Sequence, residues 1–151
     1  MSKGKIFLLS EKEHTALLKL ASVIQKSKNW TQQWYIRNLL IGLKGEYAYS
    51  KYTGQTLNTT VFKNSGDGGI DFPDGAQVKT TTFDGTDKHI RVTKIIPSVK
   101  KYILAYHNPS IDPYKIILYG EISRENFELK SYKMIDTHYR ILGVKDLDIY
   151  Y

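Results

Sequence analysis

The sequence predicts a single domain of mixed α and β structure over residues 1–151. Three observations lead to this fold class. Apolar residues in the first third recur at helical spacing after a capping signal. The rest of the chain consists of short β-branched or alternating runs separated by turn residues. The chain is also long enough for one hydrophobic core, and its 41% hydrophobic and 25% charged residues are typical of a globular domain.

Two helices are expected at the amino end. Ser10 and Glu13 form the Ser-x-x-Glu pattern of a capping box, in which the two side chains accept from free amides at a helix start. This pattern predicts a helix over residues 11–26. A polar break follows, and a second helix is expected over residues 32–52 with Gly54 as its stop.

The remaining elements are strands, with one short helical turn among them. Glycine, proline, asparagine and aspartate mark the boundaries between these elements. The expected strands cover residues 59–63, 76–82, 89–96, 102–106, 115–122 and 139–142, and the helical turn covers 123–127.

The stretch SGDGGIDFPDGAQVKTTT, residues 65–82, combines an acidic, glycine-rich turn with a strand. Gln77 and Lys79 are two residues apart, so their side chains point to one face, while Val78 points to the other face and into the core. If Asp71 shares the Gln77 face, then a carboxylate, an amide oxygen and an ammonium group meet at the end of the sheet. The alternative is an ordinary solvated hairpin with polar ends.

Such a group of side chains is suited to phosphodiester hydrolysis. Carboxylate and amide oxygens are ligands that Mg²⁺ prefers, and an ammonium group can orient the attacking water. Glu46 adds a second carboxylate, because its spacing places it on the apolar side of the second helix, where a charge needs a partner. Gly42 and Gly45 beside it indicate that the sheet or a substrate approaches this helix closely.

These residues resemble a known family. GDGGID followed by QVK is similar to the PD-(D/E)XK nuclease superfamily, in particular its Mrr-type restriction endonuclease branch. GLKGEYAYSKYTG resembles the helix that supplies an extra glutamate in many of these nucleases, including resolvase-like members. YGEISRENF resembles the strand and turn that end small members. The likeness spans residues 42–127.

The resemblance implies a restriction-endonuclease-like αβββαβ core, a mixed sheet flanked by helices. It implies Asp71 as the central metal ligand, Gln77 in the position more often held by Glu or Asp, Lys79 as the catalytic lysine and Glu46 as the helical carboxylate. The backbone carbonyl of Val78 would be a further ligand. The implied cofactor is Mg²⁺, with Mn²⁺ able to replace it.

The sequence departs from the family pattern in two places. Gln77 is neutral, which lowers the expected affinity for the metal. The superfamily also has a helix after the lysine strand, whereas residues 82–102 show alternation and Pro97. A parallel crossover would fit in this length if it were irregular or carried an added hairpin.

The net charge of +7 favours a polyanionic partner, nucleic acid first and DNA above RNA. A set of basic residues follows the candidate site, and it is either a solvated face or a path for a phosphate backbone. It consists of Lys88, Arg91, Lys94, Lys100 and Lys101.

Three functions are compatible with the sequence: a metal-dependent endonuclease, a catalytically inactive nucleic-acid-binding module of the same fold, and a small protein-interaction domain. The family implies a homodimer acting on duplexes. The sequence shows no added specificity domain. Cleavage of nucleic acid would therefore be structure-selective or non-specific, or a protein partner would supply the specificity. The chain has no cysteine, which removes disulfides and thiolate sites and suits the cytoplasm. Its first apolar run is too short for a membrane span.

Overall fold

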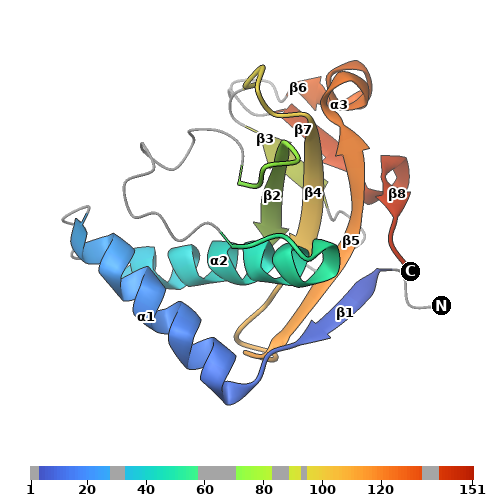
Figure 1. The fold of residues 1–151 in the computed structure, drawn as a ribbon. Coiled ribbons are helices and arrows are strands. Elements are labelled where there is room, and N and C mark those ends of the chain that lie inside the picture. Colours follow the sequence, from blue (N-terminus) through green and yellow to red (C-terminus); the bar gives the residue numbers. More distant parts are fainter. Residues whose placement is uncertain (1–3, 28–32, 58–70, 83–88, 93–94, 134–139) are drawn as a thin grey trace.

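The computed structural model describes residues 4–27, 33–57, 71–82, 89–92, 95–133 and 140–151, and Figure 1 shows their arrangement. Two helices, α1 (Glu11–Ser27) and α2 (Gln33–Thr53), lie on one side of a mixed five-stranded sheet, with α2 next to the strands. A three-stranded sheet and the short helix α3 (Arg124–Lys130) lie on the other side. The mixed α/β class predicted from the sequence is confirmed.

The five-stranded sheet positions the candidate site. Its order is β1-β5-β4-β2, and β8 also pairs with β5. Only β2 and β4 are parallel to each other; the other pairs are antiparallel. Within the described part of the chain, β2 has a strand neighbour on one side only. The five strands are β1 (Lys5–Leu8), β2 (Ala76–Thr81), β4 (Lys101–Tyr106), β5 (Lys115–Ser123) and β8 (Asp148–Ile149).

The connection between the parallel strands β2 and β4 carries a strand and, in its described residues, no helix. This strand, β3 (His89–Val92), leaves the main sheet and pairs with β7 (Arg140–Gly143), which in turn pairs with β6 (Tyr132–Lys133). The parallel crossover that the sequence allowed is present, and its described residues carry a strand of the second sheet instead of the added hairpin. The predicted strand over residues 89–96 is shorter than expected.

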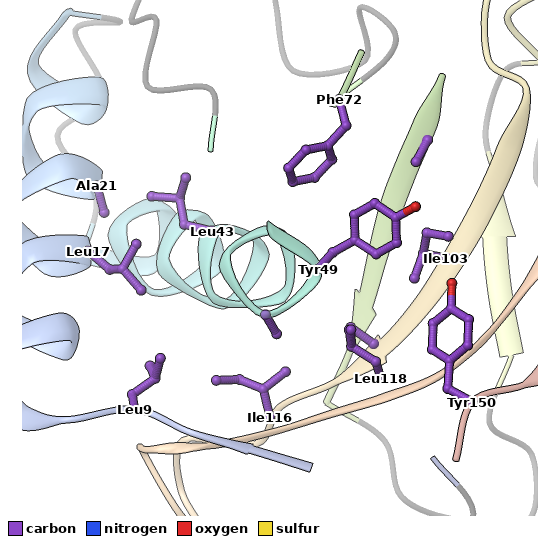
Figure 2. Packing of buried hydrophobic residues seen from close by; sticks show 13 residues of the cluster. Leu9, Leu17, Ala21, Leu43, Tyr49, Phe72, Ile103, Ile116, Leu118 and Tyr150 are labelled. Atoms are coloured by element: carbon purple, nitrogen blue, oxygen red, sulfur yellow. The ribbon is translucent and has the colours of Figure 1, made fainter. Parts of the chain in front are cut away.

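Two hydrophobic cores fill the spaces on either side of the main sheet. In the first core, Tyr49 of α2 lies between Phe72 and Ile103 of β4 (Figure 2). Its ring meets that of Phe72 edge to face, with the centroids 5.0 Å apart. The second core lies between the main sheet, β3 and α3, and is centred on Leu104 and Phe127. Since each face of the sheet buries apolar residues, polar side chains on its strands are confined to strand ends and to the free edge of β2.

The capping signals of the sequence act as predicted. The Ser10 hydroxyl accepts from the Glu13 amide at 3.1 Å, and the Glu13 carboxylate accepts from the Ser10 amide at 2.8 Å. The expected helical turn after β5 is the full helix α3, whose N-cap Ser123 accepts from Asn126. Strands β1, β6 and β8 and the 3₁₀ turn Val144–Asp146 were not predicted. The strand expected at 59–63 lies outside the described residues.

The two glycines of α2 have different surroundings. A Cβ added at Gly45 would lie 1.9 Å from Thr80 Oγ1 of β2 and 3.3 Å from Ala105 Cβ of β4, so the sheet approaches the helix here. At Gly42 no described atom lies within 4 Å of such a Cβ. The close approach expected from the sequence is therefore made by the sheet at Gly45, while Gly42 faces open space.

Candidate functional site

Asp71 is held against the free side of β2. Its backbone N–H donates to Ala76 O at 2.8 Å, and its carboxylate Oδ2 accepts from the Val78 N–H at 2.8 Å. The N–H and C=O of one strand residue point to the same side, so the Val78 carbonyl also points toward the side of the strand on which Asp71 lies. The charge of Asp71 is thus fixed beside the strand that carries Gln77 and Lys79.

Gln77 and Lys79 lie on the face of β2 that points away from α2. In the parallel pairing, Gln77 is opposite Tyr102 and Lys79 is opposite Leu104, both of which belong to the second core. Gln77 is buried, with 6% of its surface exposed, whereas Lys79 is half-buried. The intervening Val78 packs on the first core, as predicted.

Glu46 belongs to α2, the helix that covers the opposite face of β2. It lies half-buried on α2, directly after Gly45, the residue that contacts Thr80 of β2. The structure therefore brings Asp71, Gln77 and Lys79 to one strand, and it does not bring Glu46 to the face that carries Gln77 and Lys79. Asp71 is in the plane of the sheet, Gln77 and Lys79 are on one face, and Glu46 is on the helix that covers the other.

Asp71, Gln77 and the Val78 carbonyl provide oxygen donors of the kind that Mg²⁺ prefers. Glu46 lies on the opposite face of β2 from Gln77, so the two do not form one ligand set. A carboxylate accepts up to about four hydrogen bonds, and one of those of Asp71 comes from the Val78 N–H. Among the described residues, no group of three or more His, Cys, Asp and Glu side chains is placed to bind a metal. Any metal here would depend on the neutral Gln77.

A pocket of about 710 Å³ opens next to Lys79, where α2, β2 and β3 meet. Its presence was not foreseen, although the glycine at position 42 of the helix was a signal for it. The residues that line it are Asn38, Ile41, Gly42, Lys79, Thr80, Thr81, Thr82, His89, Arg91 and Leu104.

Asp74 belongs to a separate polar network at the start of β2 and β4. Its carboxylate accepts from the Tyr49 hydroxyl at 2.7 Å and from the Ala76 amide at 3.0 Å. Lys101 Nζ lies 3.6 Å from Asp74 Oδ2 and 3.5 Å from Glu121 Oε2. Burial alone would raise the pKa of Asp74, but these hydrogen bonds and the charge of Lys101 together lower it.

The three residues of the basic set that the structure describes have different surroundings. Lys101 is paired with two carboxylates, so its charge is balanced within the protein, and we withdraw it from the predicted nucleic-acid-binding set. Arg91 is exposed on β3 and lines the pocket. Lys100 is exposed, with its side chain next to Gly75. Lys88 and Lys94 lie outside the described residues.

A buried basic cluster, not predicted from the sequence, lies at the other end of the sheet. Lys44 of α2 is fully buried and donates to the Pro113 carbonyl at 2.6 Å. Burial lowers the pKa of Lys44 to about 8. His107 is also fully buried, with its Nδ1 2.8 Å from the Lys115 carbonyl oxygen, and burial lowers its pKa. Both groups have protein partners, which indicates a structural role.

The chain matches no protein-family model, and neither the curated proteins nor the solved structures with which it was compared include a match. Function therefore has to be inferred from the site itself. In the described part of the chain, no helix has the length and apolar character needed to cross a membrane.

Proposed function

We propose that the protein is a metal-dependent nuclease that hydrolyses phosphodiester bonds of nucleic acid, with DNA as the first candidate. The observation that carries the proposal is the hydrogen bond from the Val78 N–H to the Asp71 carboxylate. It ties the acidic residue of the GDGGID motif to the strand that carries Gln77 and Lys79. These are the residues on which the resemblance to PD-(D/E)XK nucleases depends.

Asp71 and Gln77, together with the carbonyl of Val78, would hold the divalent cation. When bound, the cation would lower the pKa of a water molecule and offset the negative charge that develops on the phosphate. The hydrogen bond from Val78 keeps the Asp71 carboxylate in one orientation, so its second oxygen has a fixed direction. Glu46 lies on the helix that covers the face of β2 opposite Gln77, so this arrangement keeps it out of the ligand set.

Lys79 would orient the attacking water and stabilise the phosphate with its ammonium group. It is half-buried and lines the pocket, so it is both supported by protein and open to a substrate. Gln77 would contribute an amide oxygen without a charge. The products implied by the family are a 5′-phosphate and a 3′-hydroxyl.

The topology supports the same assignment. Helix α2 precedes the strand that carries Lys79, and a crossover then leads to the adjacent parallel strand β4. In the described residues this order agrees with the αβββαβ core in the parallel pairing that follows the lysine strand, but no described strand lies between α2 and β2, and the crossover carries β3 where the family has a helix.

A cleavage assay tests the proposal. Linear duplex, single-stranded and four-way-junction DNA and single-stranded RNA are incubated with the protein in Mg²⁺, Mn²⁺ or EDTA. Cleavage of at least one substrate is expected with either metal, and no cleavage is expected in EDTA. Lys79→Met, which keeps the length of the side chain without its charge, should abolish it. Lys12→Gln, an exposed change on α1, is the control for lost charge.

The buried, neutral Gln77 favours a second candidate, an inactive nucleic-acid-binding module with the same fold. The two are separated by metal binding, because a ligand that binds the native state raises the melting temperature by mass action. The nuclease should melt at a higher temperature in Mn²⁺, and Asp71→Asn should remove the increase. An inactive module should bind DNA and show no metal-dependent increase.

A further inference from the structure

Strand β1 forms an open edge of the main sheet, on the side opposite the candidate site (Figure 1). It pairs with β5 in an unbroken antiparallel register from Lys5 to Leu8, and the Leu9 N–H extends this register by donating to Tyr114 O at 2.8 Å. Backbone groups of successive strand residues point to alternate sides. Since Leu9 bonds toward β5, the N–H and C=O groups of Ile6 and Leu8 point away from β5, to the open side.

The two edges of the main sheet differ in how their backbone is covered. At β2, Asp71 accepts from the Val78 N–H and donates to the Ala76 carbonyl. At β1, no segment of the described chain is hydrogen-bonded to the strand from its open side. The strand also has no proline and no bulge, two features that protect sheet edges, and its one charged residue, Lys5, stands at its end. An edge of this kind is a template for a further strand.

Exposed apolar side chains gather at the same edge. Ile6 and Leu8 share the face of β1 that points away from the first core, and they are 48% and 68% exposed. On the other face, the exposed Tyr52 ring meets the Phe7 ring edge to face, with the centroids 6.4 Å apart. The exposed Tyr114 is bonded through its carbonyl to the residue that follows β1. Apolar side chains collected at one place on a surface mark an interaction site.

We propose that β1 is a dimerisation surface, on which a second copy of the chain pairs its own β1 in antiparallel orientation. The pairing joins the two five-stranded sheets into one continuous sheet. The homodimer expected from the family resemblance had no defined interface, and β1 supplies one. The inference does not depend on the nuclease assignment, because it rests on the opposite edge of the sheet.

A second copy fits because the open side of β1 is complementary to itself in one register. With a two-fold axis at Phe7, Ile6 faces the partner's Leu8, and Leu8 faces the partner's Ile6. Each of these pairs then exchanges both N–H···O bonds through the backbone groups that point to the open side. On the exposed face, each isoleucine packs against a leucine, and cross-strand pairs of apolar side chains stabilise a sheet.

The same register keeps like charges apart and limits the assembly to two copies. The two copies of Lys5 would lie ~14 Å apart along the strands, at ~3.4 Å per residue. This distance exceeds the Debye length of ~10 Å at ~0.1 M salt, so their repulsion is largely screened. A two-fold contact uses the β1 edge of both copies. Since the Asp71 turn covers the β2 edge, the joined sheet has no second open edge at which to grow.

Sedimentation equilibrium tests the proposal by measuring mass at ~100 μM, where a dimer with a Kd of ~10 μM is mostly formed. We expect the wild type at twice the chain mass of 17.4 kDa. Ile6→Lys/Leu8→Lys places like charges opposite each other across the two-fold axis and should weaken dimerisation at least ~10-fold. Ile6→Lys/Leu8→Glu places opposite charges there and should retain the dimer. Leu129→Lys, at an exposed apolar residue of α3, is the matched control and should leave the dimer unchanged.

Two results would overturn the proposal. One is a wild-type monomer at that concentration, which would leave the edge to a strand of another protein. The other is a dimer that the Lys/Lys variant weakens no more than the Lys/Glu variant does, because association would then use another surface or another register. Circular dichroism and the melting temperature establish that each variant is folded. The nuclease proposal stands or fails separately, since the cleavage assay and this measurement share no variant.

Discussion

The contact between α2 and β2 predicts opposite effects for two glycine substitutions three residues apart. In Gly45→Ala the new methyl group would lie 1.9 Å from Thr80 Oγ1 and 3.2 Å from Thr80 Cβ, so either the hydroxyl rotates or the helix moves away. Overpacking of this kind costs ~1–3 kcal/mol, and the helix propensity of alanine returns ~1 kcal/mol. We therefore expect a net loss of up to ~2 kcal/mol. Gly42→Ala should gain up to ~1 kcal/mol.

Urea unfolding followed by circular dichroism measures both variants, with a constant slope as the check on two-state behaviour. For a chain of this size, ~1 kcal/mol corresponds to ~2–4 °C in melting temperature. Thr80→Ala removes the atom nearest to the new methyl group. The double variant Gly45→Ala/Thr80→Ala should therefore lose less unfolding free energy than the two single variants lose together. An increase in stability for Gly45→Ala equal to that for Gly42→Ala would refute the close approach of α2 to β2, and with it the placement of Glu46.

Three further predictions concern ion pairs and buried charges. A hydrogen bond from Lys51 is the main cause that lowers the pKa of Glu13 to about 2, so its contribution to stability is complete above pH 4.5 and is lost as the pH falls toward 2. Glu13→Gln should therefore lower the melting temperature at pH 6 and have no effect near pH 2. Burial lowers the pKa of Lys44 from 10.5 to about 8, so the unfolded chain binds more protons between these values. Wild-type stability should accordingly rise relative to Lys44→Met from pH 8 to 10.5, as thermal melts would show. Lys101→Met should lower the unfolding free energy by ~0.5–1 kcal/mol, because Asp74 and Glu121 lose their partner, and should leave the salt dependence of DNA binding unchanged.

Local signals in the sequence were sufficient to predict the elements that begin or end at side-chain caps. Ser10 with Glu13 located the start of α1, and the strand predicted at residues 115–122 agrees with β5. The short edge strand β1 was missed because its four residues have no period of their own. They become a strand only by pairing with β5, which is a long-range contact.

The candidate site was only partly predictable for a similar reason. The two-residue spacing of Gln77 and Lys79 fixed their common face, and the register with β4 agrees with it. The sequence could not indicate that this face points away from α2, because that depends on which core each side of the sheet meets. It also could not separate Lys101 from the other basic residues, since the carboxylate of Glu121 is 20 residues away along the chain and adjacent only through pairing.

The cleavage rate of Asp71→Asn in Mg²⁺ tests the central claim most directly. Asparagine retains an oxygen that can accept from the Val78 N–H, so the turn and β2 should fold as in the wild type while the charge is lost. Under single-turnover conditions, on the best substrate of the wild type, we predict a loss of at least ~100-fold with an unchanged melting temperature in EDTA. Cleavage at the wild-type rate by a folded Asp71→Asn protein would contradict the assignment of this strand edge as a metal-dependent nuclease site.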